Sequence, residues 1–284
     1  MIVKSYAKIN LALYVLDKRN DGYHNIVSLV TKIDLFDTIE IKPSKTLSVL
    51  TSIDSINNEQ NLAYRAAKAF FEQCHIKDAV QIDIEKNIPL QAGLGGGSSN
   101  AAYVLLALNK MYEYPLSFDE LVSLASSLGS DCVLFLYQNA CIVCSRGEKA
   151  YKLNYTFLPE EIIIIKPPFG VSTKLAYSNL ILTKHNNINR MKLVDKLNKG
   201  GPLAVMHNDL ESSVFKLYPV LERIKLKVYE IVQNALLCGS GSSIFAFAQS
   251  SADQIISVFD ESYFIKKATI LNNEGRFLYE HYRS

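Results

Sequence analysis

The stretch that decides the fold of this chain reads Ile88-Pro-Leu-Gln-Ala-Gly-Leu-Gly-Gly-Gly-Ser-Ser-Asn-Ala-Ala102. Before it, Val80–Glu85 alternates apolar and polar residues, which predicts a half-buried strand. After it, helix-forming residues continue to Met111 and predict a helix with Ser98 or Ser99 as N-cap. The first N–H groups of a helix lack intrahelical partners, and its dipole is positive there. A glycine loop between strand and helix therefore predicts an anion site suited to phosphate.

The glycine spacing excludes two common phosphate motifs. No Gly-Lys-Ser or Gly-Lys-Thr follows the glycines, so this is not a Walker A loop. The spacing GxGGG also differs from the GxGxxG of dinucleotide-binding folds. On spacing alone, a tight loop that only packs a helix on a strand remains an alternative.

Strands and helices alternate along the rest of the chain. Ile2–Val15 predicts a strand in which Lys8 and Asn10 share one face. Further elements are predicted as strands or helices from apolar periodicity, caps and turns: a turn at Asn20-Asp-Gly22, a strand at Ile26–Ile33, helices at Asn61–Cys74 and Ser117–Gly129, a strand at Ile162–Ile165, a helix from Pro219, strands at Leu236–Cys238 and Ile244–Ala248, a helix from Ser251 and a strand near Phe264–Leu271. We expect two mixed domains, residues 1–155 and 156–284.

Composition excludes several classes of protein. The 284 residues include 30 Lys and Arg against 28 Asp and Glu, so the formal net charge is +2. Near-neutrality argues against a protein that coats nucleic acid or an anionic membrane. No apolar run reaches the roughly 18 residues that span a bilayer, and no secretory signal is visible.

The five cysteines are predicted to be free thiols. Cys141-Ile-Val-Cys144 is the only CxxC, has no nearby histidine and lies in a predicted strand, where positions i and i+3 point to opposite faces. We therefore expect neither a disulfide nor a metal site there, and a cytoplasmic protein.

Three motifs in the chain, taken together, resemble the GHMP kinase family. Pro89–Ala102 is similar to the family's central ATP-binding motif, and Leu237-Cys-Gly-Ser-Gly-Ser-Ser-Ile-Phe245 is similar to its C-terminal motif. Tyr6–Leu11 and Arg19–His24 resemble the N-terminal signature of one branch. The resemblance implies an α+β fold of two domains, one like ribosomal protein S5 domain 2 and one ferredoxin-like, with the active site between them.

The resemblance also implies a reaction. Family members transfer a phosphoryl group from ATP with Mg²⁺, and this branch acts on a hydroxyl of a small molecule that carries a cytidine diphosphate group in non-mevalonate isoprenoid synthesis. Lys8 would stabilise the transferred phosphoryl group, and Asn10 would position the accepting hydroxyl. Asp131 would be the general base, although Ser130, Cys132, Val133 and Leu134 depart from the usual family spelling.

The substrate's base would lie against aromatic side chains. By resemblance, Tyr23 and Tyr177 stack on the cytosine, His24 hydrogen-bonds to it, and Thr173 makes a polar contact. The ATP site would be formed by the glycine loops and neighbouring positions: Asn61, Lys86, Pro89, Gly93, Leu94, Gly95, Gly96, Gly97, Ser98, Ser99, Asn100, Gly239, Ser240 and Gly241. No side-chain cage for a metal is expected; Mg²⁺ would arrive with ATP and contact Ser98 or Ser99.

Three alternatives differ in testable ways. A GHMP kinase for mevalonate, homoserine or a sugar would have no base to stack on Tyr23 and Tyr177. An RNA-binding module would need a basic face, against which the charge of +2 argues. A catalytically inactive relative would be expected to lack Lys8, Asp131 or the glycine loop. The sequence leaves the oligomeric state open between a monomer and a weak homodimer.

Overall fold

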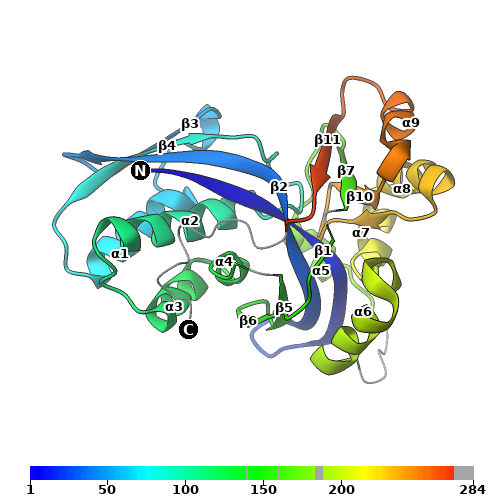
Figure 1. Ribbon diagram of the computed structural model, residues 1–284, viewed down its shortest axis with the longest axis horizontal. Helices are drawn as coiled ribbons and strands as arrows, with labels where there is room; N and C mark the ends of the chain where they lie inside the picture. The colour runs from blue at the N-terminus through cyan, green and yellow to red at the C-terminus, as the bar shows by residue number, and fades with distance from the viewer. Residues whose placement is uncertain (139, 159, 183–187, 272–284) are drawn as a thin grey trace.

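Two long antiparallel strands form the centre of the fold. In the computed structural model, which describes residues 1–138, 140–158, 160–182 and 188–271, β1 (Ile2–Lys18) pairs with β2 (His24–Ser44). Both strands run from the part of the molecule that contains α1 and α2 toward the part formed by the later half of the chain, and they bend on the way (Figure 1). Their register shifts between Tyr6 and Ala7 and between Asn10 and Ala12. Such bulges bend a strand, and an extra residue changes which face the following side chains occupy.

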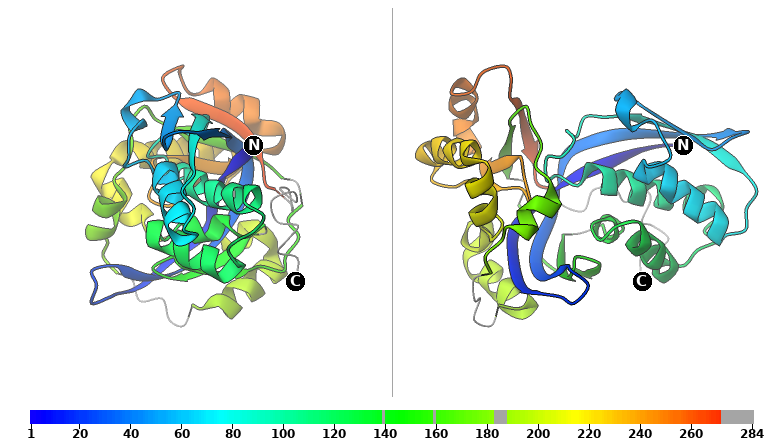
Figure 2. Two further views of the ribbon diagram at one scale, coloured as in Figure 1. Left: turned by 90° about the vertical axis from the view of Figure 1, so that its left-hand side faces the viewer. Right: turned by 180° about the vertical axis from the view of Figure 1, so that it is seen from behind.

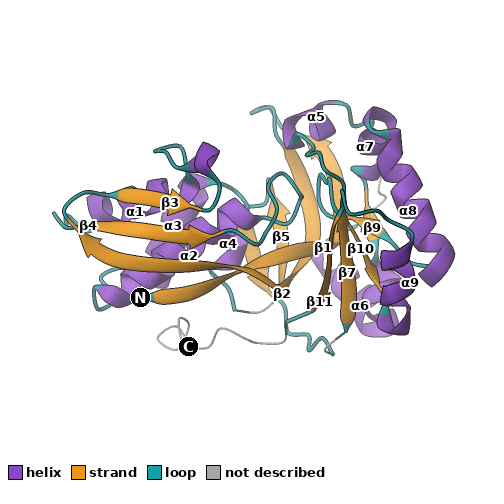
Figure 3. Cartoon of the chain, turned by 90° about the horizontal axis from the view of Figure 1, so that it is seen from above, coloured by secondary structure: helices purple, strands orange, loops and turns teal. Residues whose placement is uncertain are grey.

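Among the described residues, the first sheet has seven strands: five in the order β3-β4-β2-β1-β8, then β5, which also pairs with β2, and β6, which pairs with β5. Its further strands are β3 (Ser48–Thr51), β4 (Ala79–Glu85), β5 (Cys141–Ser145), β6 (Lys149–Lys152) and β8 (His207–Asn208). Helices α1 to α4 gather on one side of the sheet (Figures 1 and 3): α1 (Leu62–Gln73), α2 (Gly96–Met111), α3 (Phe118–Leu128) and α4 (Cys132–Phe135). The short 3-10 turn η1 (Asp54–Ile56) precedes α1.

Helix α2 is the buried helix of this half. Its residues from Ser99 to Asn109 are all buried, as expected for a helix that is apolar on nearly every side. The expected N-cap was wrong: the helix begins at Gly96, and its N-cap is Gly95 with φ +73° rather than Ser98 or Ser99. Only glycine adopts that left-handed conformation at little cost.

The second sheet belongs wholly to the later part of the chain. Its order is β11-β7-β10-β9, formed by β7 (Glu161–Lys166), β9 (Leu236–Leu237), β10 (Ile244–Phe247) and β11 (Phe264–Thr269). Figure 2 shows helices beside it: α7 (Glu211–Leu217), α8 (Pro219–Val232) and α9 (Ala252–Ser257), the last preceded by η2 (Gln249–Ser251). The sequence interpretation did not include α5 (Thr173–Ser178) or α6 (Arg190–Val205).

The two sheets are tied together through β1 and β2. Strand β8, from the later half, pairs in parallel with Ala12 and Leu13 of β1. Ile33 of β2 forms a bridge with Ile270. A hydrophobic cluster contains Ala7, Ile9 and Leu11 of β1 together with side chains of β7 and β10. The prediction that Lys8 and Asn10 share one face of the strand is confirmed, since they bond to each other while Ala7, Ile9 and Leu11 enter this cluster. The proposed domain ranges 1–155 and 156–284 stay a prediction.

Local signals in the sequence are confirmed at several places. Ser117 and Glu120 form the expected capping box of α3. The five cysteines are free, and Cys141 and Cys144 lie on β5. Within the described ranges, no helix is long and apolar enough to cross a membrane.

Candidate active site

A cavity of about 1270 Å³ lies where the first glycine loop (residues 93–97) and the second glycine loop (residues 239–241) meet β1. Its lining includes residues 89–98, residues 21–24, residues 171–174 with Tyr177 and Ser178, and also Lys8, Asn10 and Asp131. The cavity therefore brings together most of the residues expected from the sequence.

Lys8 is a buried cation that faces the cavity. It is only 4% exposed, and its Nζ donates to Oδ1 of Asn10 at 2.6 Å. Asn10 in turn donates to Oγ of Ser28 at 2.8 Å, and Ser28 donates to the carbonyl of Ala12 at 2.6 Å. This chain of bonds fixes the ammonium group in one position, because each partner is held by the next.

Asp131 approaches Lys8 from the other side. Its Oδ2 lies 4.0 Å from Nζ of Lys8, and its side chain is 49% exposed. Asp131 is the N-cap residue of α4 but makes no side-chain cap hydrogen bond. The carboxylate therefore faces the cavity beside a cation and is not used to cap the helix.

The first glycine loop packs against the second at a distance only glycine permits. A Cβ on Gly93 would lie 1.8 Å from the carbonyl oxygen of Cys238, and Gly93 has φ +76°. The backbone N–H groups of Ser242 and Ser243 donate to the carbonyls of Gln91 and Ala92, at 3.2 and 3.1 Å. The two loops thus form one continuous wall of the cavity.

The second glycine loop also approaches Lys8 and Asn10 of β1. A Cβ on Gly239 would lie 3.2 Å from both Nζ of Lys8 and Oδ1 of Asn10. Ser240 shares a 2.8 Å hydrogen bond with the hydroxyl of Thr173. Thr173 opens α5, so this bond connects the loop to the segment that carries Tyr177.

Aromatic rings also line the cavity. His24 stacks on Tyr177, with centroids 5.3 Å apart and planes inclined by 28°. The guanidinium of Arg146 lies 5.3 Å from the ring centre of Tyr23, which is 54% exposed. Burial and the nearby Lys18 lower the pKa of His24, so the neutral imidazole predominates near pH 7. Burial raises the pKa of the Tyr177 hydroxyl.

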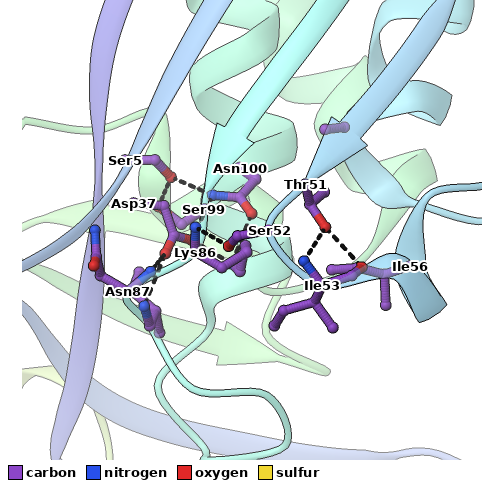
Figure 4. A network of polar contacts seen from close by, with 12 residues as sticks. Ser5, Asp37, Thr51, Ser52, Ile53, Ile56, Lys86, Asn87, Ser99 and Asn100 are labelled. Carbon is purple, nitrogen blue, oxygen red and sulfur yellow. Dashed lines mark hydrogen bonds and ion pairs between the residues drawn. The ribbon is translucent and has the colours of Figure 1, made fainter.

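A buried polar network lies behind the glycine loop (Figure 4). Lys86 forms an ion pair with Asp37, and both side chains are at most 2% exposed. Lys86 also donates to Oδ1 of Asn100 at 3.0 Å, and Asp37 accepts from Nδ2 of Asn100 at 2.9 Å. The hydroxyl of Ser99 bonds to Ser5 and to the carbonyl of Tyr6. These groups fix the first turns of α2 to β1 and β2.

The structure changes the interpretation of four expected ATP contacts. Ser99 and Asn100 are buried and do not line the cavity, because their side chains bond to neighbouring strands. Asn61 also lies outside the lining; its side chain caps α1 by accepting from the N–H of Ala63 at 2.9 Å. Lys86 lines the cavity although its ammonium is paired with Asp37. The other residues expected at the site all line it: Lys8, Asn10, Tyr23, His24, Pro89, Gly93, Leu94, Gly95, Gly96, Gly97, Ser98, Asp131, Thr173, Tyr177, Gly239, Ser240 and Gly241.

Several cavity residues were not anticipated. Lys18, Arg146 and Lys174 place three further cations in the lining. Arg146 lies in the turn between β5 and β6, and no sequence motif predicts that it lies at the site. Its contact with the ring of Tyr23 in the folded chain places it there. Within the part of the chain that the structure describes, no group of three or more His, Cys, Asp or Glu side chains is arranged to hold a metal.

The chain is similar to proteins of known name. The family described as GHMP kinases N terminal domain matches residues 61–139. A 4-diphosphocytidyl-2-C-methyl-D-erythritol kinase of Thermodesulfovibrio yellowstonii is 40% identical over 261 residues, which are 88% of this chain and 90% of that protein.

Solved structures show the same architecture. A crystal structure of 4-(cytidine 5'-diphospho)-2C-methyl-D-erythritol kinase superimposes with a TM-score of 0.79 at 28% identity, covering 96% of this chain and 100% of the other. The mevalonate kinase of Methanococcus jannaschii gives a TM-score of 0.67 at 18% identity over 96% of this chain and 98% of its own, a likeness of fold.

Proposed function

The chain belongs to the 4-diphosphocytidyl-2-C-methyl-D-erythritol kinases of the GHMP kinase family, and from this membership we propose which of its residues carry the reaction. The enzyme uses ATP to phosphorylate 4-diphosphocytidyl-2-C-methyl-D-erythritol in isoprenoid precursor biosynthesis. The acceptor in our proposal is the 2-hydroxyl group, and the other product is ADP.

One observation carries the assignment of the reacting groups. Lys8 and Asp131 approach to 4.0 Å inside a cavity that is lined both by glycine loops and by aromatic rings. Such a cavity can bind the phosphates of a nucleotide at the loops and a pyrimidine base at the rings, which leaves a hydroxyl of the linking group near Lys8 and Asp131.

Asp131 is the proposed general base. The acceptor oxygen forms a bond to the γ-phosphorus while the bond from that phosphorus to the bridging oxygen of ATP breaks. The hydroxyl proton moves to a carboxylate oxygen of Asp131, and ADP keeps the electron pair of the broken bond. A carboxylate is much less basic than an alkoxide, so proton transfer accompanies phosphoryl transfer and does not precede it.

Lys8 is the proposed electrostatic catalyst. Its buried ammonium is held by Asn10, so it does not have to reorient when negative charge develops on the phosphoryl oxygens. Gly239 lies close to the same ammonium, which supports a role for the second glycine loop at the transferred group.

The glycine loop at residues 93–97 is the proposed site of the ATP phosphates. It opens helix α2, whose free N–H groups and dipole favour anions. Mg²⁺ would neutralise phosphate charge when bound with ATP. Ser98 lines the cavity while Ser99 is buried, so Ser98 is the proposed hydroxyl contact for phosphate or metal.

The aromatic end is the proposed cytosine site. Tyr23, His24 and Tyr177 line the same region, and Thr173 offers a hydroxyl beside them. The free thiols of the described residues support a reducing compartment, and we propose that the enzyme acts in the cytoplasm.

The function is tested by ADP release. The purified protein should turn over with ATP and 4-diphosphocytidyl-2-C-methyl-D-erythritol and show no turnover with mevalonate or homoserine. Turnover with mevalonate or homoserine but not with the cytidine substrate would contradict the proposal.

A further inference from the structure

Asn208 is a buried amide that lies behind the second glycine loop and does not line the cavity. It lies on β8, is 5% exposed, and pairs through its backbone with Leu13 of β1. Its Nδ2 donates to the carbonyl of Leu237 at 2.8 Å and to that of Gly239 at 2.7 Å. Its Oδ1 accepts from the N–H of Leu210 at 3.0 Å. One side chain thus binds both ends of the segment that leads into the loop.

Neighbouring residues extend the same connection. Asp209 accepts from the N–H of Val15 on β1 at 2.7 Å, and its own N–H donates to the carbonyl of Leu13 at 3.0 Å. Glu211 accepts from the N–H of Leu237 at 3.0 Å and pairs with Lys225 at 2.6 Å. Residues 208–211 are therefore bonded to β1 on one side and to the strand before the glycine loop on the other.

The position of Gly239 gives this connection a consequence for the reaction. The place of its missing Cβ is 3.2 Å from Nζ of Lys8. In a planar trans peptide the N–H points opposite to the C=O. Because the carbonyl of Gly239 points to Asn208, the N–H of Ser240 points away from Asn208. Ser240 lines the cavity, so Asn208 controls how this peptide group is presented beside Lys8.

We infer that Asn208 is a positioning residue: it fixes the Gly239–Ser240 peptide relative to Lys8 so that loop and ammonium act on the same phosphoryl group. This inference rests on the proposed function, because it assigns the second glycine loop to the transferred phosphoryl group. Glu211 supports the same peptide through Leu237.

Asn234 provides a matched control. Its Nδ2 donates to the carbonyls of Val232 and Phe247 at 2.9 and 3.1 Å, and its Oδ1 accepts from the N–H of Phe247 at 2.7 Å. It therefore makes the same three kinds of bond as Asn208, but its partners Val232 and Phe247 do not line the cavity, whereas Gly239, the partner of Asn208, does. Replacing either asparagine by aspartate removes both donors and leaves the shape of the side chain unchanged.

The experiment compares Asn208→Asp with Asn234→Asp. Both are expected to lower the melting temperature. Well below that temperature, Asn208→Asp should lower kcat at least tenfold with the KM of the cytidine substrate within threefold of wild type. Asn234→Asp should leave kcat within twofold. Equal kcat for wild type and folded Asn208→Asp, or an equal loss of kcat in both variants, would overturn the inference.

A second pair of variants keeps the inference testable if Asn208→Asp does not fold. Glu211→Ala removes the acceptor for the N–H of Leu237 and should lower kcat, while Glu211→Gln keeps an acceptor oxygen and should restore it. Failure of Glu211→Gln to restore kcat would contradict the inference. In protein with labelled lysines, the NMR resonance of Lys8 Nζ should shift in Asn208→Asp and in Glu211→Ala but not in Asn234→Asp. This measurement needs no turnover, so it separates failure of the inference from failure of the proposed function.

Discussion

The imidazole of His24 stacks on the ring of Tyr177, with the two centroids 5.3 Å apart. His24 begins β2 of the first sheet, whereas Tyr177 lies on α5 in the later half of the chain. The pair joins the two halves of the chain at the lining of the cavity. A base that binds between aromatic rings must either displace this contact or stack beside it.

Removal of the ring of Tyr23 or of Tyr177 is expected to weaken substrate binding. Stacking contributes about 1–3 kcal/mol per base, so Tyr23→Ala and Tyr177→Ala should each raise the KM of the cytidine substrate by roughly 5- to 150-fold. The KM of ATP should not change, because Tyr23 and Tyr177 are proposed to contact the cytosine of the substrate and not ATP. Tyr229→Ala is the control, since Tyr229 is 45% exposed on α8 outside the lining. An unchanged substrate KM in both cavity variants would place the base elsewhere.

Substrate affinity should depend on pH through His24. Burial and Lys18 lower the pKa of His24 below 6.5, and Asp17 only partly opposes this. The substrate KM should therefore be flat from pH 7 to 8 and rise as pH falls through the lowered pKa, because the imidazolium has no acceptor nitrogen. The pKa of His24 is higher in the unfolded chain than in the folded chain. As pH falls from 6.5 through the lowered pKa, the unfolded chain binds the proton first, and the free energy of unfolding decreases. The acid rise in KM should disappear in His24→Gln; a rise centred above pH 6.5 in the wild type would contradict this.

The buried ion pair behind the glycine loop should be costly to break. Asp37→Asn leaves the Lys86 ammonium buried without its carboxylate and should lower the free energy of unfolding by about 3–5 kcal/mol. Adding Lys86→Met should recover part of that loss, because no unpaired charge then remains. The comparison is the exposed pair Asp195–Lys199 on α6, where Asp195→Asn should cost no more than about 0.5 kcal/mol. Urea unfolding measures all three; a similar cost for both aspartates would show that burial of the pair adds nothing.

Two glycines of the same loop should respond oppositely to alanine. Gly95 has φ +73°, and a Cβ there would lie 2.9 Å from the Phe135 ring and 3.1 Å from Cγ of Lys8. Gly95→Ala should therefore destabilise the protein by at least about 1–2 kcal/mol. Gly97 is helical, and its Cβ would only touch Leu62 at 3.7 Å. Gly97→Ala should be neutral or stabilising by up to about 1 kcal/mol. Thermal unfolding checks both, and equal melting temperatures for the two variants would contradict the expectation.

Local sequence signals predicted much of the fold because short-range physics determines them. The Ser117–Glu120 capping box involves residues three positions apart, and the alternation along β1 follows from strand geometry. Helix α6 was missed because Gly201, at φ +68°, and Pro202 interrupt its pattern.

Contacts between residues that lie far apart in the chain could not be predicted from local sequence patterns. Lys86 was expected at ATP, yet its partner Asp37 lies 49 positions away in the chain. The bonds of Asn208 to Leu237 and Gly239 span 29 and 31 positions, so no local pattern in the sequence indicates them. Ser99 was expected to contact phosphate or Mg²⁺, but in the folded chain its hydroxyl bonds to Ser5 and to the carbonyl of Tyr6.

The most direct test of the catalytic proposal is the turnover number of Asp131→Asn. The side chain is 49% exposed and does not cap α4, so the variant should fold and bind ATP with unchanged affinity. Because the amide cannot accept the hydroxyl proton, kcat with the cytidine substrate should fall by about 10²- to 10⁴-fold. Asp253→Asn, on an exposed carboxylate paired with Lys267, should retain wild-type kcat. A kcat within threefold of wild type for Asp131→Asn would contradict the assignment of Asp131 as the base beside Lys8.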